Sequence, residues 1–162
     1  MFLLLSAGSS VAFAQAGQAV VSNDQVLSVS GEVARTLKLN ASDLAKLPRQ
    51  TVNAKDHDGK AAIFEGVALV DVLRLAGVEF GDKLRGKNLA LFLVVDASDG
   101  YRAVFALPEL DPAFADQAII LAHSRDGKPL PEAEGPWRII VSKEKRQARW
   151  VRKVVAFTIG RA

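Results

Sequence analysis

The chain contains no cysteine among its 162 residues. This absence excludes thiolate nucleophiles, thiolate metal ligands and Cys-x-x-Cys redox motifs. Histidine is also scarce, because His57 and His123 are the only two, and they lie far apart without the spacing of metal ligands. We therefore expect no zinc site and no metal that is bound through sulfur.

Motifs for the common catalytic mechanisms are missing as well. The sequence has no Gly-x-Ser-x-Gly nucleophile elbow, no His-Glu-x-x-His helix and no phosphate-binding glycine loop. Asp56 and Asp58 could act as a carboxylate pair, but the segment Asp56-His-Asp-Gly-Lys60 is typical of a turn. We therefore interpret this segment, including His57, as a solvated turn in which nothing desolvates the two carboxylates.

No charged side chain precedes Asp24. The chain begins with an apolar stretch that ends in Ala12-Phe-Ala14, and signal peptidase accepts small residues at both ends of such a triplet. We interpret residues 1–16 as a secretory signal peptide, the alternative being a short buried helix. The basic first segment of a signal is missing, so we expect the true start to lie upstream. The protein would then be periplasmic or secreted.

The apolar stretch is too short for a transmembrane anchor, since about 20 apolar residues are needed to span a bilayer. We therefore expect no stable membrane insertion after the signal is cleaved. The formal net charge of +3 is too small to indicate nucleic acid as a partner. Hydrophobic residues make up 49% of the chain, a share typical of a globular protein, and no linker composition divides it. We expect one domain, at residues 24–160.

Alternating and apolar segments predict at least seven β-strands. Residues 25–30 and 36–39 read as one hairpin, and residues 51–64 as a second hairpin around the turn at Asp56. The other predicted strands are 89–95, 101–107, 117–123, 137–141 and 150–159. The first of these is apolar throughout, so we expect both of its faces to be buried.

Helical segments are few and short. Residues 67–76 form the clearest helix, because apolar residues fall at i, i+3, i+4 and i+7 from Leu69 and Gly77 can end the helix in a left-handed conformation. A single helical turn over 42–47 is expected to be capped by Ser42. Many strands with few helices predict an α+β fold that is rich in β-structure.

Basic residues concentrate between Arg138 and Lys153, where seven of them stand against one acid, Glu144. The only two tryptophans, Trp137 and Trp150, lie beside and within this stretch. The combination predicts an anion site, in which guanidinium groups hold phosphate or carboxylate and an indole covers a flat ring. A solvated hairpin tip, with Trp150 packed on the sheet, explains the pattern equally well.

The only tyrosine, Tyr101, follows a tight Asp99-Gly100 turn at the start of a predicted strand. Its residue chemistry alone favours a half-buried strand position, with the hydroxyl bonded to a backbone group. His123 ends an apolar strand, and we expect it to be structural rather than catalytic.

Several blocks of the sequence, in the same order, resemble the molybdopterin-binding domain of the sulfite oxidase family. They are Phe64-Glu-Gly-Val-Ala-Leu-Val-Asp-Val-Leu-Arg-Leu-Ala-Gly-Val78, Tyr101-Arg-Ala-Val-Phe-Ala-Leu-Pro108, Ile119-Ile-Leu-Ala-His-Ser-Arg-Asp-Gly-Lys-Pro-Leu-Pro131, Gly135-Pro-Trp-Arg138 and Ala148-Arg-Trp-Val-Arg-Lys-Val-Val-Ala-Phe-Thr-Ile159. The resemblance covers roughly residues 27–159. It implies a sulfite-oxidase-like mixed β-sheet fold with a few short helices.

In that family a molybdenum atom is held by a pterin dithiolene and one cysteine, and the centre transfers oxygen atoms. By position, Tyr101 resembles the family's active-site tyrosine, which would make it the catalytic residue if the chain is an enzyme. Arg138 resembles the arginine that follows a Gly-Pro segment, and Arg152 stands where a pterin-contacting lysine is usual. Together with Trp137 and Arg149, these residues form the predicted cofactor-binding set.

The chain also departs from the family pattern. The metal-binding cysteine is missing, and the chain is about half as long as the family's catalytic domain. Glu134 stands where a histidine is common, and the charged segment 142–147 replaces a loop that contains glycine. A carboxylate ~4 Å from an anionic phosphate costs about 4 kcal/mol at an effective dielectric constant near 20. These changes oppose ordinary binding of the molybdenum cofactor.

We therefore expect an exported binding module on a sulfite-oxidase-like scaffold, without a cysteine-ligated metal. Its partner would be a small anionic ligand or a redox partner protein. The alternative is a molybdopterin-dependent oxidoreductase or a subunit of one, for which the resemblance implies molybdopterin as the cofactor. A structural or assembly domain, which needs no pocket, is the third hypothesis.

Overall fold

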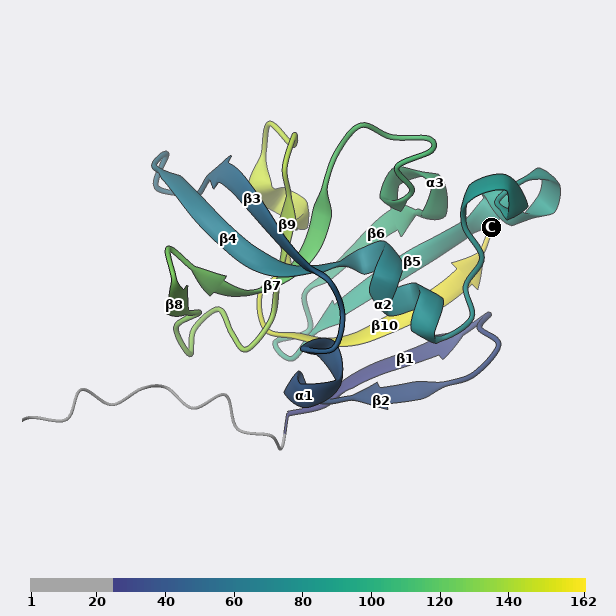
Figure 1. Cartoon of the computed structure of the whole chain (residues 1–162), viewed down its shortest axis with the longest axis horizontal. Coiled ribbons are helices and arrows are strands. Elements are labelled where there is room, and N and C mark those ends of the chain that lie inside the picture. The colour runs from purple at the N-terminus through teal and green to yellow at the C-terminus, as the bar shows by residue number, and fades with distance from the viewer. Residues whose placement is uncertain (1–24) are drawn as a thin grey trace, which may run out of the picture.

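The computed structural model describes residues 25–162, so the predicted signal peptide lies outside the described residues. Two β-sheets share one hydrophobic core (Figure 1). The first sheet contains, in spatial order, β2 (Leu37–Leu39), β1 (Leu27–Gly31), β10 (Val154–Arg161), β5 (Leu91–Ala97) and β6 (Arg102–Ala106). The second contains β3 (Arg49–Lys55), β4 (Ala61–Ala68), β7 (Ile119–Arg125) and β8 (Lys128–Pro129), with β9 (Arg138–Val141) also paired to β7.

The first sheet is mixed, the second is antiparallel, and the helices are short. β1 runs parallel to β10, whereas every other strand pair in the described chain is antiparallel. The helical elements are α1 (Ala41–Leu44), α2 (Leu69–Leu75), α3 (Leu107–Leu110) and the 3-10 turns η1 (Gly81–Lys83), η2 (Gly86–Ala90) and η3 (Gln147–Arg149). This architecture confirms the predicted β-rich α+β fold. None of the helices in residues 25–162 is long and apolar enough to cross a membrane.

Local patterns account for the two hairpins and for α2. The hairpin β1–β2 and the hairpin β3–β4 form as predicted, with the latter turning at Asp56–Lys60. In α2 the apolar stripe from Leu69 is buried in the core. Gly77 follows with φ +84°, and the N–H of Val78 donates to the carbonyl of Leu73, which is the left-handed helix ending that the glycine predicted.

Two predicted helix starts are wrong. The longer helix begins at Leu69 rather than at residue 67, because Val67 and Ala68 continue β4 and pair with β7. The shorter helix is capped by Asn40 rather than by Ser42. The Asn40 side chain accepts a hydrogen bond from the N–H of Asp43, whose carboxylate accepts one from the N–H of Asn40, and this reciprocal pair forms a capping box.

The sequence also misplaces two strands. The segment predicted at 89–95 forms β5 two residues later, at Leu91–Ala97. Only the face that carries Leu93, Val95 and Ala97 is buried, so the prediction that both faces are buried is wrong. The segment predicted at 150–159 becomes strand only at Val154. Trp150 instead ends the turn η3 and packs into the core, where the residue is 4% exposed.

The close approach of β4 to β7 depends on Gly66. A Cβ atom at this position would lie 2.1 Å from the carbonyl oxygen of Leu121, a backbone atom that cannot move aside without shifting β7. The register between the two strands shifts at the same point. β7 carries the residues that pair with β9, so this contact positions both strands.

We predict that Gly66→Ala lowers the free energy of unfolding by about 3 kcal/mol or more, because the added methyl group forces the two strands apart. Urea unfolding followed by circular dichroism measures the change. Gly59→Ala is the matched control: it has a positive φ of +75° but nothing within 4 Å, so it should cost only about 1 kcal/mol. Equal losses for the two variants would contradict the proposed clash.

Candidate functional site

A charge cluster lies where the β3–β4 turn meets the end of β7 and the start of β9. It consists of Asp56, Arg125, Glu134 and Arg138, and Arg138 at its centre is fully buried. The Arg138 guanidinium donates from Nη2 to Asp56 at 2.8 Å and from Nη1 to Glu134 at 2.7 Å. Arg125 donates to the second oxygen of Asp56 at 2.6 Å. The charge of Arg138 is therefore matched within the protein.

Two aromatic rings enclose the guanidinium of Arg138. Its central carbon lies 5.4 Å from the ring centre of Trp150 and 5.5 Å from that of Phe64. The two rings meet edge to face, 5.7 Å apart. Such rings attract a cation through their negative faces and keep water away from it. The Nε–H of Arg138 is the one buried donor of this side chain without a partner in the described chain.

Ionisation of Asp56 is favoured by its surroundings. Burial by itself would raise the pKa of this carboxyl group. The hydrogen bonds from Arg138 and from the backbone N–H of His57, with the charges of Arg138 and Arg125, outweigh burial and hold the pKa at about 2. Asp56 is thus a permanent anion at neutral pH, and it stays paired with Arg138.

The sequence interpretation of Asp56 as a solvated turn residue is wrong, because its side chain is 4% exposed. A signal for its burial was present. Val52 and Ala54 point inward from β3, and Asp56 falls at the next inward position of the same alternation. Asp58 and His57 remain exposed, as a turn predicts. The burial comes from Arg125 and Arg138, which lie 69 and 82 residues away in the sequence.

A second feature is a cleft of about 260 Å³, which we call the Tyr101 cleft. Its lining residues come from three segments of the chain: His57, Asp99, Tyr101, Gln147, Ala148, Trp150 and Arg152. Trp150 belongs to both features, since its ring contacts Arg138 and also lines the cleft. The indole N–H of Trp150 is buried and has no hydrogen-bond partner in residues 25–162.

Tyr101 is half exposed, and its hydroxyl group is already engaged. It donates a hydrogen bond of 2.6 Å to the carbonyl of Ala148, which ties the start of β6 to the segment around η3. The hydroxyl oxygen can still accept a hydrogen bond, but it would have to leave Ala148 before it could donate one to a ligand. A backbone partner for the hydroxyl is what the residue chemistry predicted.

The structure separates the predicted site residues into groups. Tyr101 and Arg152 line the same cleft, whereas Arg138 lies in the charge cluster. Trp137 is buried and lines other pockets. Arg149 lies outside the cleft lining: it pairs with Glu144 and Glu109 and stacks over Phe105 at 4.5 Å. Desolvation works against its charge, but these acids raise the pKa of Arg149 overall.

A molybdenum atom held by a thiolate does not fit these residues. The chain has no cysteine, and residues 25–162 contain no group of three or more metal-ligating His, Cys, Asp or Glu side chains. Arg138, which by resemblance would hold an anion, already has its charge matched by Asp56 and Glu134. What the Tyr101 cleft does offer is a cationic edge, at Arg152.

Comparison with known proteins supports the fold. The family described as oxidoreductase molybdopterin binding domain matches residues 16–159. The crystal structure of the sulfane dehydrogenase SoxCD from Paracoccus pantotrophus is similar, with a TM-score of 0.67 and 20% sequence identity. The similarity covers 85% of this chain and 38% of that one, so the chain spans well under half of its structural neighbour. None of the curated proteins matches the sequence.

We predict that Asp56→Asn lowers the free energy of unfolding by about 3 kcal/mol, because a buried guanidinium loses its main counter-charge. Chemical denaturation measures the loss. Asp58→Asn, two residues away, is the matched control: its carboxylate is 47% exposed and lies 3.5 Å from Arg125, so it should cost less than about 1 kcal/mol. A loss for Asp56→Asn as small as that of the control would contradict the structural role of the cluster.

The low pKa of Asp56 also predicts how stability depends on pH. Because the pKa of about 2 lies below the ordinary 3.8, ionised Asp56 stabilises the folded state above pH 4, and this contribution is lost as the pH falls through 2. The loss amounts to about 2 kcal/mol. Denaturant unfolding at several pH values between 5 and 2 gives the free energy of unfolding as a function of pH. The wild type should lose more of this free energy as the pH falls than Asp56→Asn does. Parallel curves would refute the assignment.

Proposed function

The chain belongs to the oxidoreductase molybdopterin-binding domain family, and on that premise we propose that it is an exported module that binds a small anionic ligand in the Tyr101 cleft. The family resemblance inferred from the sequence blocks is thereby confirmed. The proposed module uses the family scaffold without a cysteine-ligated metal. Its export rests on the signal-like residues 1–16, and detection of a periplasmic form that begins near residue 15 or 17 would test it.

The contrast between two arginines carries the proposal. Arg138 is fully buried, and its charge is matched by Asp56 and Glu134. Arg152 is 42% exposed at the cleft, and its nearest carboxylate, that of Glu134, is 3.9 Å away. In the described chain Arg152 donates no hydrogen bond, so its planar fork of donors is free for a phosphate or carboxylate group. The cation that the cleft offers is therefore Arg152.

The other lining residues suit a small anion that also carries an O–H group, such as hydrogen phosphate. The hydroxyl oxygen of Tyr101 and the amide oxygen of Gln147 can accept hydrogen bonds from that group, because Gln147 uses only its amide nitrogen, toward the carbonyl of Lys55. The buried N–H of Trp150 lacks an acceptor, and leaving such a donor unpaired costs about 1–3 kcal/mol. After a small movement of the indole, a ligand oxygen could be that acceptor. Asp99 lies in the lining too, and its carboxylate accepts from the N–H of Tyr101.

A second candidate is a subunit of a molybdopterin-dependent oxidoreductase, which the family match favours. A redox partner protein would then have to supply the metal ligands that this chain lacks. The similarity to only 38% of the neighbouring chain is in keeping with a missing part of the site. Stoichiometric molybdenum with an extractable pterin in protein from its own host would favour this candidate over the module.

We predict that inorganic phosphate shifts the indole N–H signal of Trp150 saturably in ¹H–¹⁵N spectra, while that of Trp137 stays in place. The two tryptophans are the only ones in the chain, so their signals report separately on the Tyr101 cleft and on the rest of the core. Arg152→Gln should weaken phosphate binding at least about tenfold, because it removes the charged donor.

Arg74→Gln is the matched control, because Arg74 is similarly exposed but lies on α2 in an ion pair with Asp71. It should leave the phosphate affinity unchanged. The proposal fails if Trp150 shows no saturable shift, or if both arginine variants weaken binding equally.

A further inference from the structure

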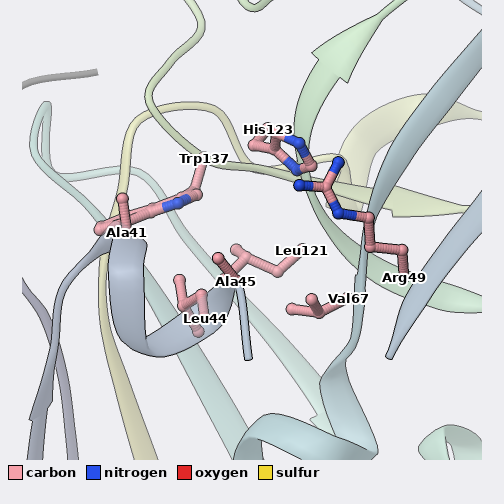
Figure 2. Close-up of a pocket in the computed structure, with 8 residues that line it drawn as sticks. All are labelled: Ala41, Leu44, Ala45, Arg49, Val67, Leu121, His123 and Trp137. Carbon is pink, nitrogen blue, oxygen red and sulfur yellow. The ribbon is translucent and has the colours of Figure 1, made fainter. Parts of the chain in front are cut away.

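A second pocket lies between α1 and the second sheet, and we call it the α1 pocket. It shares no lining residue with the Tyr101 cleft and has a volume of about 210 Å³. Its lining residues are Ala41, Leu44, Ala45, Arg49, Val67, Leu121, His123 and Trp137 (Figure 2). Of these residues only Trp137 belongs to the predicted cofactor-binding set, and the proposed function assigns no role to the pocket.

The body of the α1 pocket is apolar. Leu44, Val67, Leu121 and Trp137 are all at least nine-tenths buried, and they come from α1, β4, β7 and the position just before β9. On the α1 side the lining also includes Ala41 and Ala45, which stand one helical turn apart. Longer side chains at these two positions would fill the space, so the small residues keep the pocket open.

Two nitrogen-bearing side chains stand together on one side of this apolar body. Figure 2 shows the guanidinium of Arg49 next to the imidazole of His123, with Trp137 across the pocket from them. Both contact one carboxylate, that of Glu65, which accepts a hydrogen bond from Nη1 of Arg49 and lies 3.6 Å from Nε2 of His123. None of the eight lining residues is acidic.

Arg49 keeps most of its donors free. Its side chain is 59% exposed, and in residues 25–162 it donates a single hydrogen bond, from Nη1 to Glu65. A guanidinium has five N–H groups, so Nε and Nη2 remain for a second carboxylate. Burial and then the charge of Arg49 lower the pKa of His123, although Glu65 opposes this. His123 is therefore a neutral imidazole at neutral pH and can donate one hydrogen bond and accept another.

From this arrangement we propose that the α1 pocket binds a small apolar monocarboxylate. The apolar part would lie against Leu44, Val67 and Trp137, and the carboxylate would accept hydrogen bonds from Arg49 at the rim. The volume sets the size, because a cavity of about 150 Å³ lined by apolar groups accepts benzene. A volume of about 210 Å³ therefore suits one aromatic ring, or a short acyl chain, with one carboxylate attached.

Benzoate and its uncharged counterpart benzamide test the proposal on the full chain. We expect benzoate to shift the indole N–H signal of Trp137 saturably and to leave that of Trp150 in place. Benzamide has nearly the same shape but no charge, so its affinity should be at least about tenfold lower. This readout is independent of phosphate binding in the Tyr101 cleft, so either proposal can fail while the other stands.

Three variants separate the charge of the pocket from its shape. Arg49→Gln should lower benzoate affinity about tenfold and leave benzamide affinity unchanged. Arg102→Gln is the matched control, since Arg102 is also an exposed strand arginine paired with a carboxylate, that of Asp96, and it should leave both affinities unchanged. Ala45→Phe, at an exposed position of the lining, should block both ligands.

An unchanged Trp150 signal in each variant verifies that the fold is intact. The proposal is overturned if benzoate causes no saturable shift of Trp137, if benzamide binds as tightly as benzoate, or if Arg102→Gln weakens benzoate binding as much as Arg49→Gln does. A benzoate shift confined to Trp150 would also overturn it, because the ligand would then occupy the Tyr101 cleft.

Discussion

The ion pair between Arg138 and Asp56 joins segments that are 82 residues apart in the chain, and the rest of the site is arranged around it. Two charges in the protein interior are tolerated only when each is paired and hydrogen-bonded. Here Asp56 also forms an ion pair with Arg125, and Arg138 also forms one with Glu134. The β3–β4 turn, the end of β7 and the start of β9 are thereby fixed to one another, and the rings of Phe64 and Trp150 close over the guanidinium.

This pairing has a consequence for function within a family of molybdopterin-binding domains. A fully buried arginine that is paired with two carboxylates, as Arg138 is, has little to gain from an external anion, because a ligand would first have to displace a carboxylate. The exposed cation beside the cluster is then Arg152, which lines the Tyr101 cleft together with Trp150, whose ring also contacts Arg138. The proposed anion binding therefore rests on the Tyr101 cleft, whereas the separate proposal of a carboxylate ligand rests on the α1 pocket, with Arg49 at its rim.

Features set by neighbours in the sequence were predictable, and those set by distant contacts were not. The stripe from Leu69 and the ending at Gly77 depend on helix periodicity and backbone freedom, so α2 could be located to within two residues. The inward alternation of Val52 and Ala54 extends to Asp56, but the partners of Asp56 could not be predicted, because no local pattern states which turn a distant arginine will reach. The sequence reveals the basic stretch from Arg138 to Lys153, but only the fold shows that Arg149 pairs with Glu144 while Arg152 lines the cleft.

The central claim is that the internal carboxylates take the place of an external anion, so that the fold is complete without the family's cofactor. It is tested most directly by comparing the melting temperature of the chain produced in a host that makes molybdopterin with that of the chain produced in a host that cannot. A ligand that binds the folded state raises its stability, so the account predicts the same melting temperature from both hosts. A rise of several degrees in the molybdopterin-producing host, accompanied by bound pterin, would contradict it.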